Sequence, residues 1–265
     1  MLRATIGIFS LILGTWAASA CAGSQRGADS VRQSESEYDI ARDLWLRRGQ
    51  VREALEHALR AVELDDENFE AAHLVALLYL DFCARSPGEC RLKEAEKAAR
   101  RALELKPDFR EARNTLGVVL IHQKRPREAI AVLKPLSEDI LYQTPEKAWG
   151  NLGWAYSEAG DLDRAIDSLR RSIAAQPLFC VGSYRLALAY ERRGELAPAL
   201  GSFSRALETK APECAQLQDA WWGRARVAER LGQTDSIRAD LERCIELSSS
   251  TQTGKNCRSM LDELK

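Results

Sequence analysis

The sequence has almost no excess of charge of either sign and no long apolar run beyond its first twenty residues. It contains 38 basic and 39 acidic residues among 265, which gives a formal net charge of −1. A nearly neutral chain lacks the basic surface that holds nucleic acid, so we do not expect nucleic acid as its main partner. No apolar stretch after residue 20 is long enough to span a bilayer.

Catalytic and metal-binding motifs are missing as well. The sequence has no H-E-x-x-H, G-x-S-x-G, phosphate-loop or G-x-G-x-x-G pattern, and it contains only three histidines. His57 is expected on a helix surface, whereas His73 and His122 are expected to make polar contacts. No two cysteines have the short spacing of structural zinc sites. We therefore expect no enzyme activity, no cofactor, no metal and no small-molecule substrate.

The sequence does have a repeat of about 34 residues. The segment from Glu146 to Phe179 recurs in five further copies, and each copy reads as two short helices joined by a turn. This period and pattern are those of tetratricopeptide repeats. The predicted fold is all-α, a right-handed α-solenoid of about six tetratricopeptide repeats with a C-terminal capping helix. The repeats span residues 35–68, 69–109, 110–145, 146–179, 180–217 and 218–251, and the cap spans residues 252–265.

Small side chains mark the places where the two helices of a repeat must approach each other. The second helix starts at an alanine in five copies, and the middle of the first helix carries another small residue in five. The first copy departs from this pattern, with Arg42 at the small position and Trp45 at the large position three residues later. Terminal repeats are expected to be atypical because one of their faces meets solvent.

Residues 1–20 read as a secretory signal peptide, with a basic residue before an apolar run and small residues that lead into Cys21. Small residues that end at a cysteine resemble a bacterial lipobox, in which the cysteine is lipidated and becomes the mature N-terminus. The alternative is plain secretion with an incidental Cys21. Residues 21–34 are small and polar, so we predict a flexible tether. Ala22, where aspartate would favour inner-membrane retention, favours the outer membrane.

Six further cysteines follow Cys21, and an even number in an exported chain favours disulfides. The repeat map places each beside one partner: at the two ends of an insertion in the second repeat, at successive turns between repeats, and in the last hairpin and its cap. We therefore predict the pairs Cys83–Cys90, Cys180–Cys214 and Cys244–Cys257. The alternative is a free buried thiol, above all at Cys244, which falls at a small buried repeat position.

The first helices of the repeats are expected to line the concave face of the solenoid. At the groove positions, the sequence has many large apolar residues that the fold itself does not need to bury. An exposed apolar strip with a polar rim usually marks a partner site, and aromatic residues are the expected anchors. The alternative is that neighbouring segments or the cap cover some of them, above all Trp222. The predicted groove residues are His73, Leu77, Leu80, Asn114, Val118, Ile121, Trp154, Tyr184, Leu188 and Trp222.

The connection between the third and fourth repeats carries a resemblance to a known family. Residues 136–156 read LSEDILYQTPEKAWGNLGWAY, a lengthened connection with a D-x-L-Y run ahead of an N-L-G helix. Together with the lipobox, this segment resembles the type IV pilus pilotins, the Tgl/PilF/PilW family, and the resemblance extends over residues 21–250. The insertion and the six cysteines look closer to the myxobacterial Tgl branch.

The resemblance implies a function. Pilotins sit on the periplasmic face of the outer membrane and help secretin subunits insert and assemble into the channel through which type IV pili pass. A lipid-anchored monomer with an apolar groove suits the shielding of a secretin subunit before assembly. The resemblance thereby implies a part in pilus biogenesis and in twitching or social gliding motility. The alternative is a lipoprotein scaffold for peptidoglycan synthesis or outer-membrane protein assembly.

Overall fold

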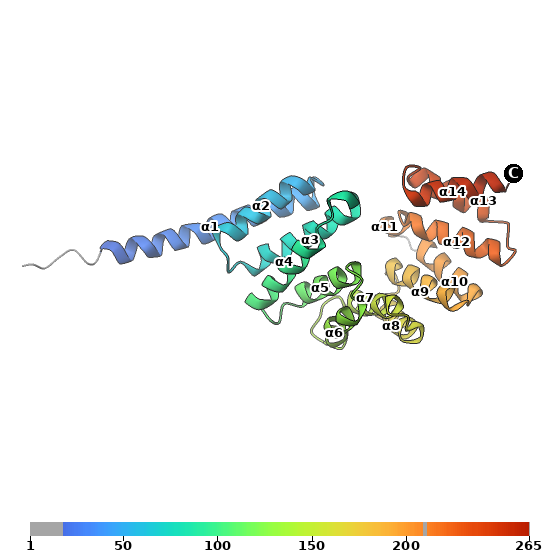
Figure 1. Ribbon diagram of the computed structural model, residues 1–265, viewed down its shortest axis with the longest axis horizontal. Coiled ribbons are helices and arrows are strands. Elements are labelled where there is room, and N and C mark those ends of the chain that lie inside the picture. Colours follow the sequence, from blue (N-terminus) through green and yellow to red (C-terminus); the bar gives the residue numbers. More distant parts are fainter. Residues whose placement is uncertain (1–17, 209–210, 265) are drawn as a thin grey trace, which may run out of the picture.

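The computed structural model describes residues 18–208 and 211–264, and these residues form helices and turns without any strand. The helices come in hairpins that follow one another along an arc (Figure 1). The hairpins are α1 (Ala18–Leu46) with α2 (Val51–Leu64), α3 (Phe69–Arg85) with α4 (Leu92–Leu105), α5 (Arg110–His122) with α6 (Pro126–Ser137), α7 (Pro145–Glu158) with α8 (Leu162–Ala175), α9 (Cys180–Arg193) with α10 (Leu196–Glu208), and α12 (Gln218–Arg230) with α13 (Ile237–Leu247). Two short elements lie in connections, and a last helix closes the C-terminal end: η1 (Pro87–Glu89), α11 (Pro212–Ala215) and α14 (Gln252–Glu263). The predicted all-α solenoid with a capping helix is confirmed.

Small side chains let the two helices of each hairpin pack closely. Ala54 and Ala165, which lie in the first turn of second helices, are fully buried. In the α7–α8 hairpin, a Cβ added to Gly153 would lie 2.5 Å from Leu169 Cγ and 3.0 Å from the Ala165 carbonyl oxygen. Tyr156, three residues after Gly153, is buried between hairpins. The spacing of small and large residues along the sequence therefore sets both contacts.

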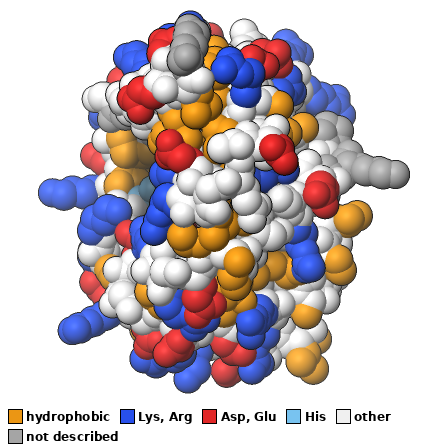
Figure 2. Space-filling view, turned by 90° about the vertical axis from the view of Figure 1, so that its right-hand side faces the viewer, with side chains coloured by type: hydrophobic (Ala, Val, Ile, Leu, Met, Phe, Trp, Pro, Cys, Tyr) orange, Lys and Arg blue, Asp and Glu red, His pale blue; other side chains and the backbone are white. Residues whose placement is uncertain are grey.

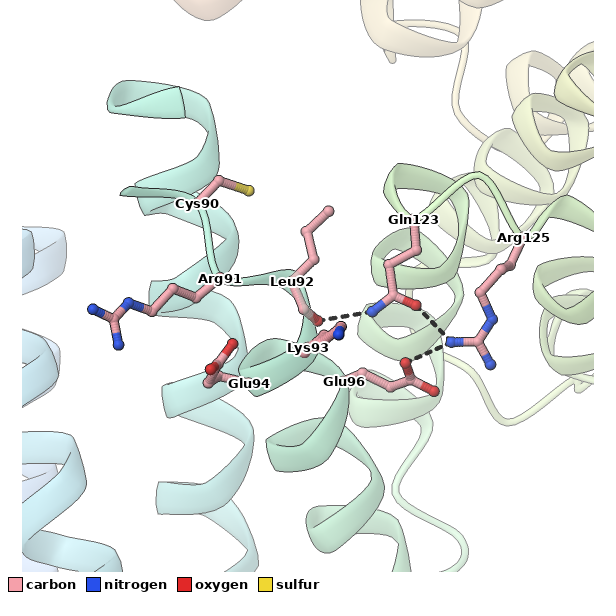
Figure 3. A pocket seen from close by; sticks show the side chains of 8 residues that line it. All are labelled: Cys90, Arg91, Leu92, Lys93, Glu94, Glu96, Gln123 and Arg125. Carbon is pink, nitrogen blue, oxygen red and sulfur yellow. Dashed lines mark hydrogen bonds and ion pairs between the residues drawn. The ribbon is translucent and has the colours of Figure 1, made fainter. Parts of the chain in front are cut away.

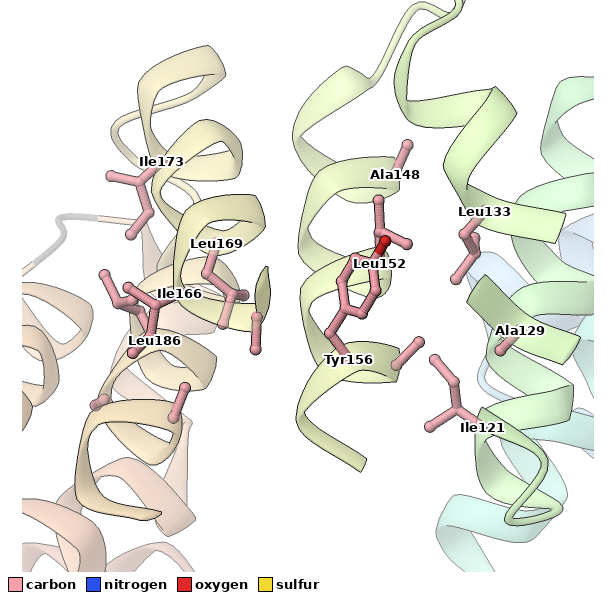
Figure 4. Packing of buried hydrophobic residues seen from close by; sticks show 14 of the residues in the cluster. Ile121, Ala129, Leu133, Ala148, Leu152, Tyr156, Ile166, Leu169, Ile173 and Leu186 are labelled. Atoms are coloured by element: carbon pink, nitrogen blue, oxygen red, sulfur yellow. The ribbon is translucent and has the colours of Figure 1, made fainter. Parts of the chain in front are cut away.

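The core is an elongated cluster, built hairpin by hairpin. Its largest part runs from α3 to α12, and the close-up shows Leu152 and Tyr156 of α7 facing Leu133 of α6, with Leu169 of α8 in the next layer (Figure 4). Each helix packs against the other helix of its hairpin and against helices of an adjacent hairpin. Solenoids of this kind gain stability as a sum over neighbouring repeats.

The turn passes through one residue in the left-handed region in five of the six hairpins; among its described residues, the α3–α4 connection with its insertion has none. Gly160 has φ +83° between α7 and α8, a conformation that glycine adopts without the penalty of a Cβ. Lys124 takes the same place between α5 and α6 at φ 61°. Its side chain reaches Glu158 of the following repeat at 3.2 Å.

The register of α1 differs by one residue from the predicted one. Ala41 is fully buried where Arg42 was expected, and the Arg42 side chain is exposed. The reason is one extra residue at the end of α1, since Gln50 N donates to Leu44 O six residues back, whereas the equivalent bonds elsewhere span five. Leu44 thus takes the large position, and Trp45 instead donates from Nε1 to Asp81 of the second repeat at 2.8 Å.

The flexible tether predicted over residues 21–34 is wrong, because the backbone of this segment is part of α1. No proline interrupts it. Its end is fixed by Ser34, which is fully buried. The Ser34 hydroxyl donates to the Ala61 carbonyl at 2.7 Å and accepts from Asn68 Nδ2 at 2.9 Å. The packed part of the first repeat therefore begins before residue 35.

The signal peptide predicted over residues 1–20 lies almost entirely outside the described residues, which begin at Ala18. Cys21 belongs to the backbone of α1. Among the helices of the described part, none is both long and apolar enough to cross a membrane.

Three disulfides tie elements together in the pairing that the repeat map predicts. Cys83–Cys90 closes the insertion that contains η1. Cys180–Cys214 joins the start of α9 to α11. Cys244–Cys257 joins α13 to the cap α14. Each bridge therefore holds a segment that departs from the plain 34-residue repeat.

Candidate partner-binding groove

The first helices of the hairpins lie toward the hollow of the arc, with α5, α7 and α9 at its middle (Figure 1). Polar side chains link successive first helices at about one repeat's separation. Asn151 Nδ2 donates to Asn114 Oδ1 at 2.8 Å, and Arg185 Nη1 donates to Asn151 Oδ1 at 2.7 Å. Farther along, Arg226 binds Glu191 at 2.6 and 3.0 Å. These five residues form what we call the polar ladder of the groove.

Apolar side chains flank the polar ladder and remain partly accessible. Some of them pack with one side against the central hydrophobic cluster, as Trp154, Tyr184 and Leu188 do. Their other side is left for a ligand. The half-buried apolar residues among those predicted for the groove are Leu77, Leu80, Val118, Trp154, Tyr184, Leu188 and Trp222.

Ile121 is not a groove residue, which corrects the prediction. Its side chain is 1% exposed and belongs to the central cluster. Four residues complete slightly more than one helical turn, so the residue that follows Val118 on the same face is His122. His122 is exposed, and its ring stands edge-on to Trp154 with 5.1 Å between centroids.

His73 lies at the wall of the groove, but its ring is engaged within the protein. Thr115 donates its hydroxyl proton to the Glu111 carbonyl, so the Thr115 oxygen accepts from His73 Nε2 at 2.8 Å. The His73 ring also packs edge-on against Phe109 at 4.9 Å. Burial lowers the pKa of His73 to about 4, so the ring is neutral at physiological pH.

Trp222 lies where the groove meets the cap. It packs against the C-terminal cluster around Cys244, Cys257 and Met260, and Arg226 stands over its ring at 5.5 Å. The expected covering by the cap is therefore partial, because the Trp222 side chain stays half-buried.

Arg185 is the most unusual side chain in the middle of the groove. Its guanidinium lies over the Trp154 ring at 4.5 Å and is hydrogen-bonded to Asn151. Burial lowers the pKa of Arg185 to about 10, which still leaves it charged at neutral pH. Beside it, burial raises the pKa of Tyr184 to about 12. The centre of the groove therefore holds a cation over an indole ring, a feature that the predicted set of mostly apolar groove residues did not include.

Sequence reasoning missed Arg185 and Asn151. Each lies two residues before the small residue of its first helix, Arg185 before Ala187 and Asn151 before Gly153. A search for apolar groove residues passes over them, because their side chains reach the groove from the neighbouring helical position. At the same position, the third and sixth repeats hold Thr115 and Gly223, so no row of polar residues at one repeat position marks the ladder.

A second exposed apolar feature lies outside the groove, in the connection before α7. Ile140 is 95% exposed and Leu141 is 62% exposed. The loop is nonetheless held in place, because Asp139 pairs with Arg110 at 2.7 Å and accepts from Leu141 N at 2.9 Å. Tyr142 anchors its other end and is buried.

A surface hollow of about 800 Å³ lies between the start of α4 and the end of α5 (Figure 3). Its polar side chains satisfy one another. Arg125 donates to Glu96 and to Gln123, both at 2.6 Å, and Gln123 donates to the Leu92 carbonyl at 2.9 Å. Within the described residues, no group of three or more histidine, cysteine, aspartate or glutamate side chains is arranged to hold a metal ion.

The rest of the surface mixes charges and small apolar patches. Figure 2 shows the side that carries the C-terminal repeats, where lysine, arginine, aspartate and glutamate side chains separate the hydrophobic ones. This agrees with the near-zero net charge. No single-sign field marks this side for a highly charged partner.

Comparison with solved structures gives the same architecture. PilW, described as a widely conserved type IV pilus biogenesis factor, superposes with a TM-score of 0.68 at 23% identity, over 84% of this chain and 97% of that one. PilF of Pseudomonas aeruginosa superposes with a TM-score of 0.64 at 18% identity, over 88% and 99%. A tetratricopeptide repeat protein of Parabacteroides merdae reaches 0.69 at 14% identity, over 92% and 90%. At these identities, the likeness establishes the fold.

One curated protein also matches, the protein O-mannosyl-transferase Tmtc3 of Drosophila melanogaster, with 29% identity over 143 residues. The match spans 53% of this chain but only 14% of the length of that protein. Family profiles described as "Tetratricopeptide repeat" match residues 89–140, 151–213 and 218–251, which together make up more than half of the chain. With the hairpins and their period, these matches show that the chain belongs to the tetratricopeptide repeat proteins.

Proposed function

We propose that this chain is an outer-membrane pilotin lipoprotein. In this proposal, the concave groove binds a secretin subunit and promotes its insertion and multimer assembly for type IV pilus biogenesis and pilus-dependent motility. Cys21 carries the lipid, and the chain faces the periplasm as a monomer. The observation that carries the proposal is a groove of accessible aromatic and aliphatic side chains on a fold that spans 97% of PilW and 99% of PilF.

The geometry suits the capture of a segment that is apolar before assembly. Trp154, Tyr184 and Leu188 each use one side to pack against the core and leave the other side for a ligand. Such pre-ordered aromatic rings lose little side-chain entropy when they bind. A lipid anchor would raise the local concentration of the captured subunit at the membrane where assembly takes place.

The first test is the state of the secretin in a deletion strain, followed on gels without heat denaturation. We expect the heat-resistant multimer to disappear while the monomer is still made, and the intact gene to restore the multimer. An unchanged multimer would contradict the pilotin proposal and favour the scaffold alternative, for peptidoglycan synthesis or outer-membrane protein assembly. Crosslinking from groove positions would then identify the partner.

The groove itself is tested by complementation with the double variant Trp154→Ala, Leu188→Ala. We expect loss of multimer, because the variant removes two apolar contacts while the ladder remains. The matched control is Leu178→Ala, which truncates a leucine that is 65% exposed in the turn before α9. Circular dichroism must show equal helix content in both variants. Full multimer with the groove variant would exclude this groove as the binding site.

A further inference from the structure

Arg185 differs from the other arginines of α9 and α12, because no carboxylate of the described residues forms an ion pair with it. Arg226 pairs with Glu191 at 2.6 Å, and Arg192 pairs with Glu158 at 3.0 Å. The partners of Arg185 are neutral: an amide oxygen and the face of an indole ring.

Hydrogen-bonding capacity remains on the Arg185 guanidinium. The group has five N–H donors, and within the described chain only Nη1 is used, in the bond to Asn151 Oδ1. Trp154 covers one face of the guanidinium, so the ring leaves the edge with Nε and Nη2 free to donate in the plane. No nitrogen of Arg185 is among the buried polar atoms without a partner, so the unused donors reach the surface and are available to an acceptor from outside the chain.

Two acidic side chains of the neighbouring first helices, Glu158 of α7 and Glu191 of α9, are already engaged. Glu158 accepts from Lys124 at 3.2 Å as well as from Arg192, and Glu191 accepts from Arg226. Turning either one toward Arg185 would break an existing ion pair. The groove centre therefore stays positive, and its charge is complementary to an anionic group on a ligand.

We propose that the groove takes an extended or helical segment that places a carboxylate on Arg185, with apolar side chains of the same segment on either side. This inference rests on the proposed function and specifies the chemistry of the partner at the same groove. The planar guanidinium fork favours a carboxylate, which it holds through two parallel hydrogen bonds.

The surroundings of Arg185 favour a peptide segment over a small free anion. Trp154, Tyr184 and Leu188 offer apolar contact next to the cation, and Leu77 and Val118 continue the apolar lining toward the N-terminal repeats. A free anion would leave these side chains uncovered. A segment with one acidic residue among apolar ones covers them and neutralises Arg185 together.

The experiment uses the full chain, purified in detergent, and a phage-displayed library of random dodecapeptides. Selected peptides are synthesised with a C-terminal amide, and each is compared with its Glu→Gln or Asp→Asn form by fluorescence anisotropy. We expect the neutral form to bind about tenfold more weakly, as for loss of one charge-assisted bidentate contact. Peptides that bind only with a free C-terminus would assign the carboxylate to the chain end.

Arg185→Gln tests where the preference arises. We expect this variant to bind the acidic and neutral peptides equally weakly, and Arg185→Lys to restore part of the difference. Arg171→Gln, which removes an exposed arginine paired with Asp167 at 3.0 Å on the second helix α8, outside the groove, is the matched control and should keep the tenfold preference. If selected peptides lack an acid, or if the preference persists in Arg185→Gln, the inference is overturned. The comparison of peptides on the unaltered chain remains decisive even if Arg185→Gln does not fold.

The secretin gel separates this inference from the proposed function. An acid preference that depends on Arg185, together with an unchanged secretin multimer in the deletion strain, would support the carboxylate site and reject the pilotin role. Loss of the multimer in the deletion strain, with peptides that ignore Arg185, would support the pilotin role and reject the carboxylate site.

Discussion

Gly153 sets the distance between α7 and α8, because its missing Cβ leaves room for Leu169 and for the Ala165 carbonyl. We expect Gly153→Ala to destabilise the protein by about 1–3 kcal/mol through overpacking, since the carbonyl oxygen cannot move without shifting α8. The measurement is the free energy of unfolding in guanidinium chloride.

The matched control is Gly201→Ala in α10, where an added Cβ would meet no atom within 4 Å. Alanine is a better helix former than glycine, so this change should raise stability by about 0.5–1 kcal/mol. Equal effects of the two substitutions would show that helix propensity, and not close packing, governs both positions.

His73 makes the stability depend on pH. Its folded-state pKa of about 4 lies below the usual value of 6.5. Between pH 4 and pH 6.5, the folded state therefore binds fewer protons than the unfolded state. Stability should be complete above pH 6.5 and fall as the pH drops from 6.5 toward 4, by about 3 kcal/mol at most. Burial lowers the pKa of His122 too, which adds in the same direction.

The check is a set of urea denaturation curves between pH 7 and pH 5, a range above the ordinary titration of carboxylates. His73→Gln should be less stable at pH 7 and show a flatter dependence on pH. An unchanged slope in this variant would assign the pH dependence to other groups.

Some single residues could be assigned from the sequence, whereas others could not. The small positions of the inner repeats follow from a period of 34, because each repeat imposes the same helix approach. Ile121 was misplaced because its neighbour His122, and not Ile121, continues the groove face from Val118. The sequence did not reveal the significance of Arg185, because the lack of an ion pair to any carboxylate in the described part of the chain becomes visible only in the three-dimensional arrangement.

Elements at the ends of the solenoid were the hardest to predict. Repeat spacing places Arg42 in the first small position, but an extra residue before the turn moves Ala41 there. The composition of residues 21–34 predicts a tether, but the segment is part of α1. Ser34 at its end is hydrogen-bonded to Ala61 of α2 and to Asn68. In both places, no preceding repeat constrains the chain.

The cap α14 is tied to its repeat by one disulfide, and removing this bond tests how far the cap depends on it. We expect Cys244→Ser with Cys257→Ser to lower the stability of the C-terminal repeat by about 3 kcal/mol, the chain-entropy value for a loop of this length. Amide hydrogen exchange should accelerate in α14 and α13.

The control is the pair Cys83→Ser with Cys90→Ser, which opens the insertion near η1. This change should speed exchange in that insertion and leave α14 protected. Equal acceleration across the whole chain in either variant would contradict a local role of the bridge.

At the scale of the whole molecule, helices pack only within their own and adjacent hairpins, so stability is local. Phe203 is fully buried between the fifth and sixth hairpins, near Tyr184 and against Gly223. We expect Phe203→Ala to cost about 3–5 kcal/mol and to uncouple α12–α14, so that they unfold at lower denaturant than the remainder. Hydrogen exchange at increasing urea would detect the two steps.

Leu59→Ala, which truncates a leucine 37% exposed on α2, should change stability by less than about 1 kcal/mol and keep the unfolding of α12–α14 coupled. A single cooperative transition in Phe203→Ala would show that the solenoid behaves as one unit despite its near-neighbour contacts.

The helical path of α1 turns the proposed lipid attachment into a spacer of defined length. From Cys21 to Ser34, which is buried, a continuous helix measures about 20 Å at 1.5 Å per residue. In a rigid helical spacer, each added residue changes both the distance between the lipid and the groove and the rotation of the groove about the helix axis. Seven residues inserted into α1 ahead of Ser34 would raise the groove by about 10 Å and keep its facing, whereas two would rotate it by roughly half a turn. In the proposed lipoprotein, the number of residues in α1 would thus set how the groove faces the bilayer.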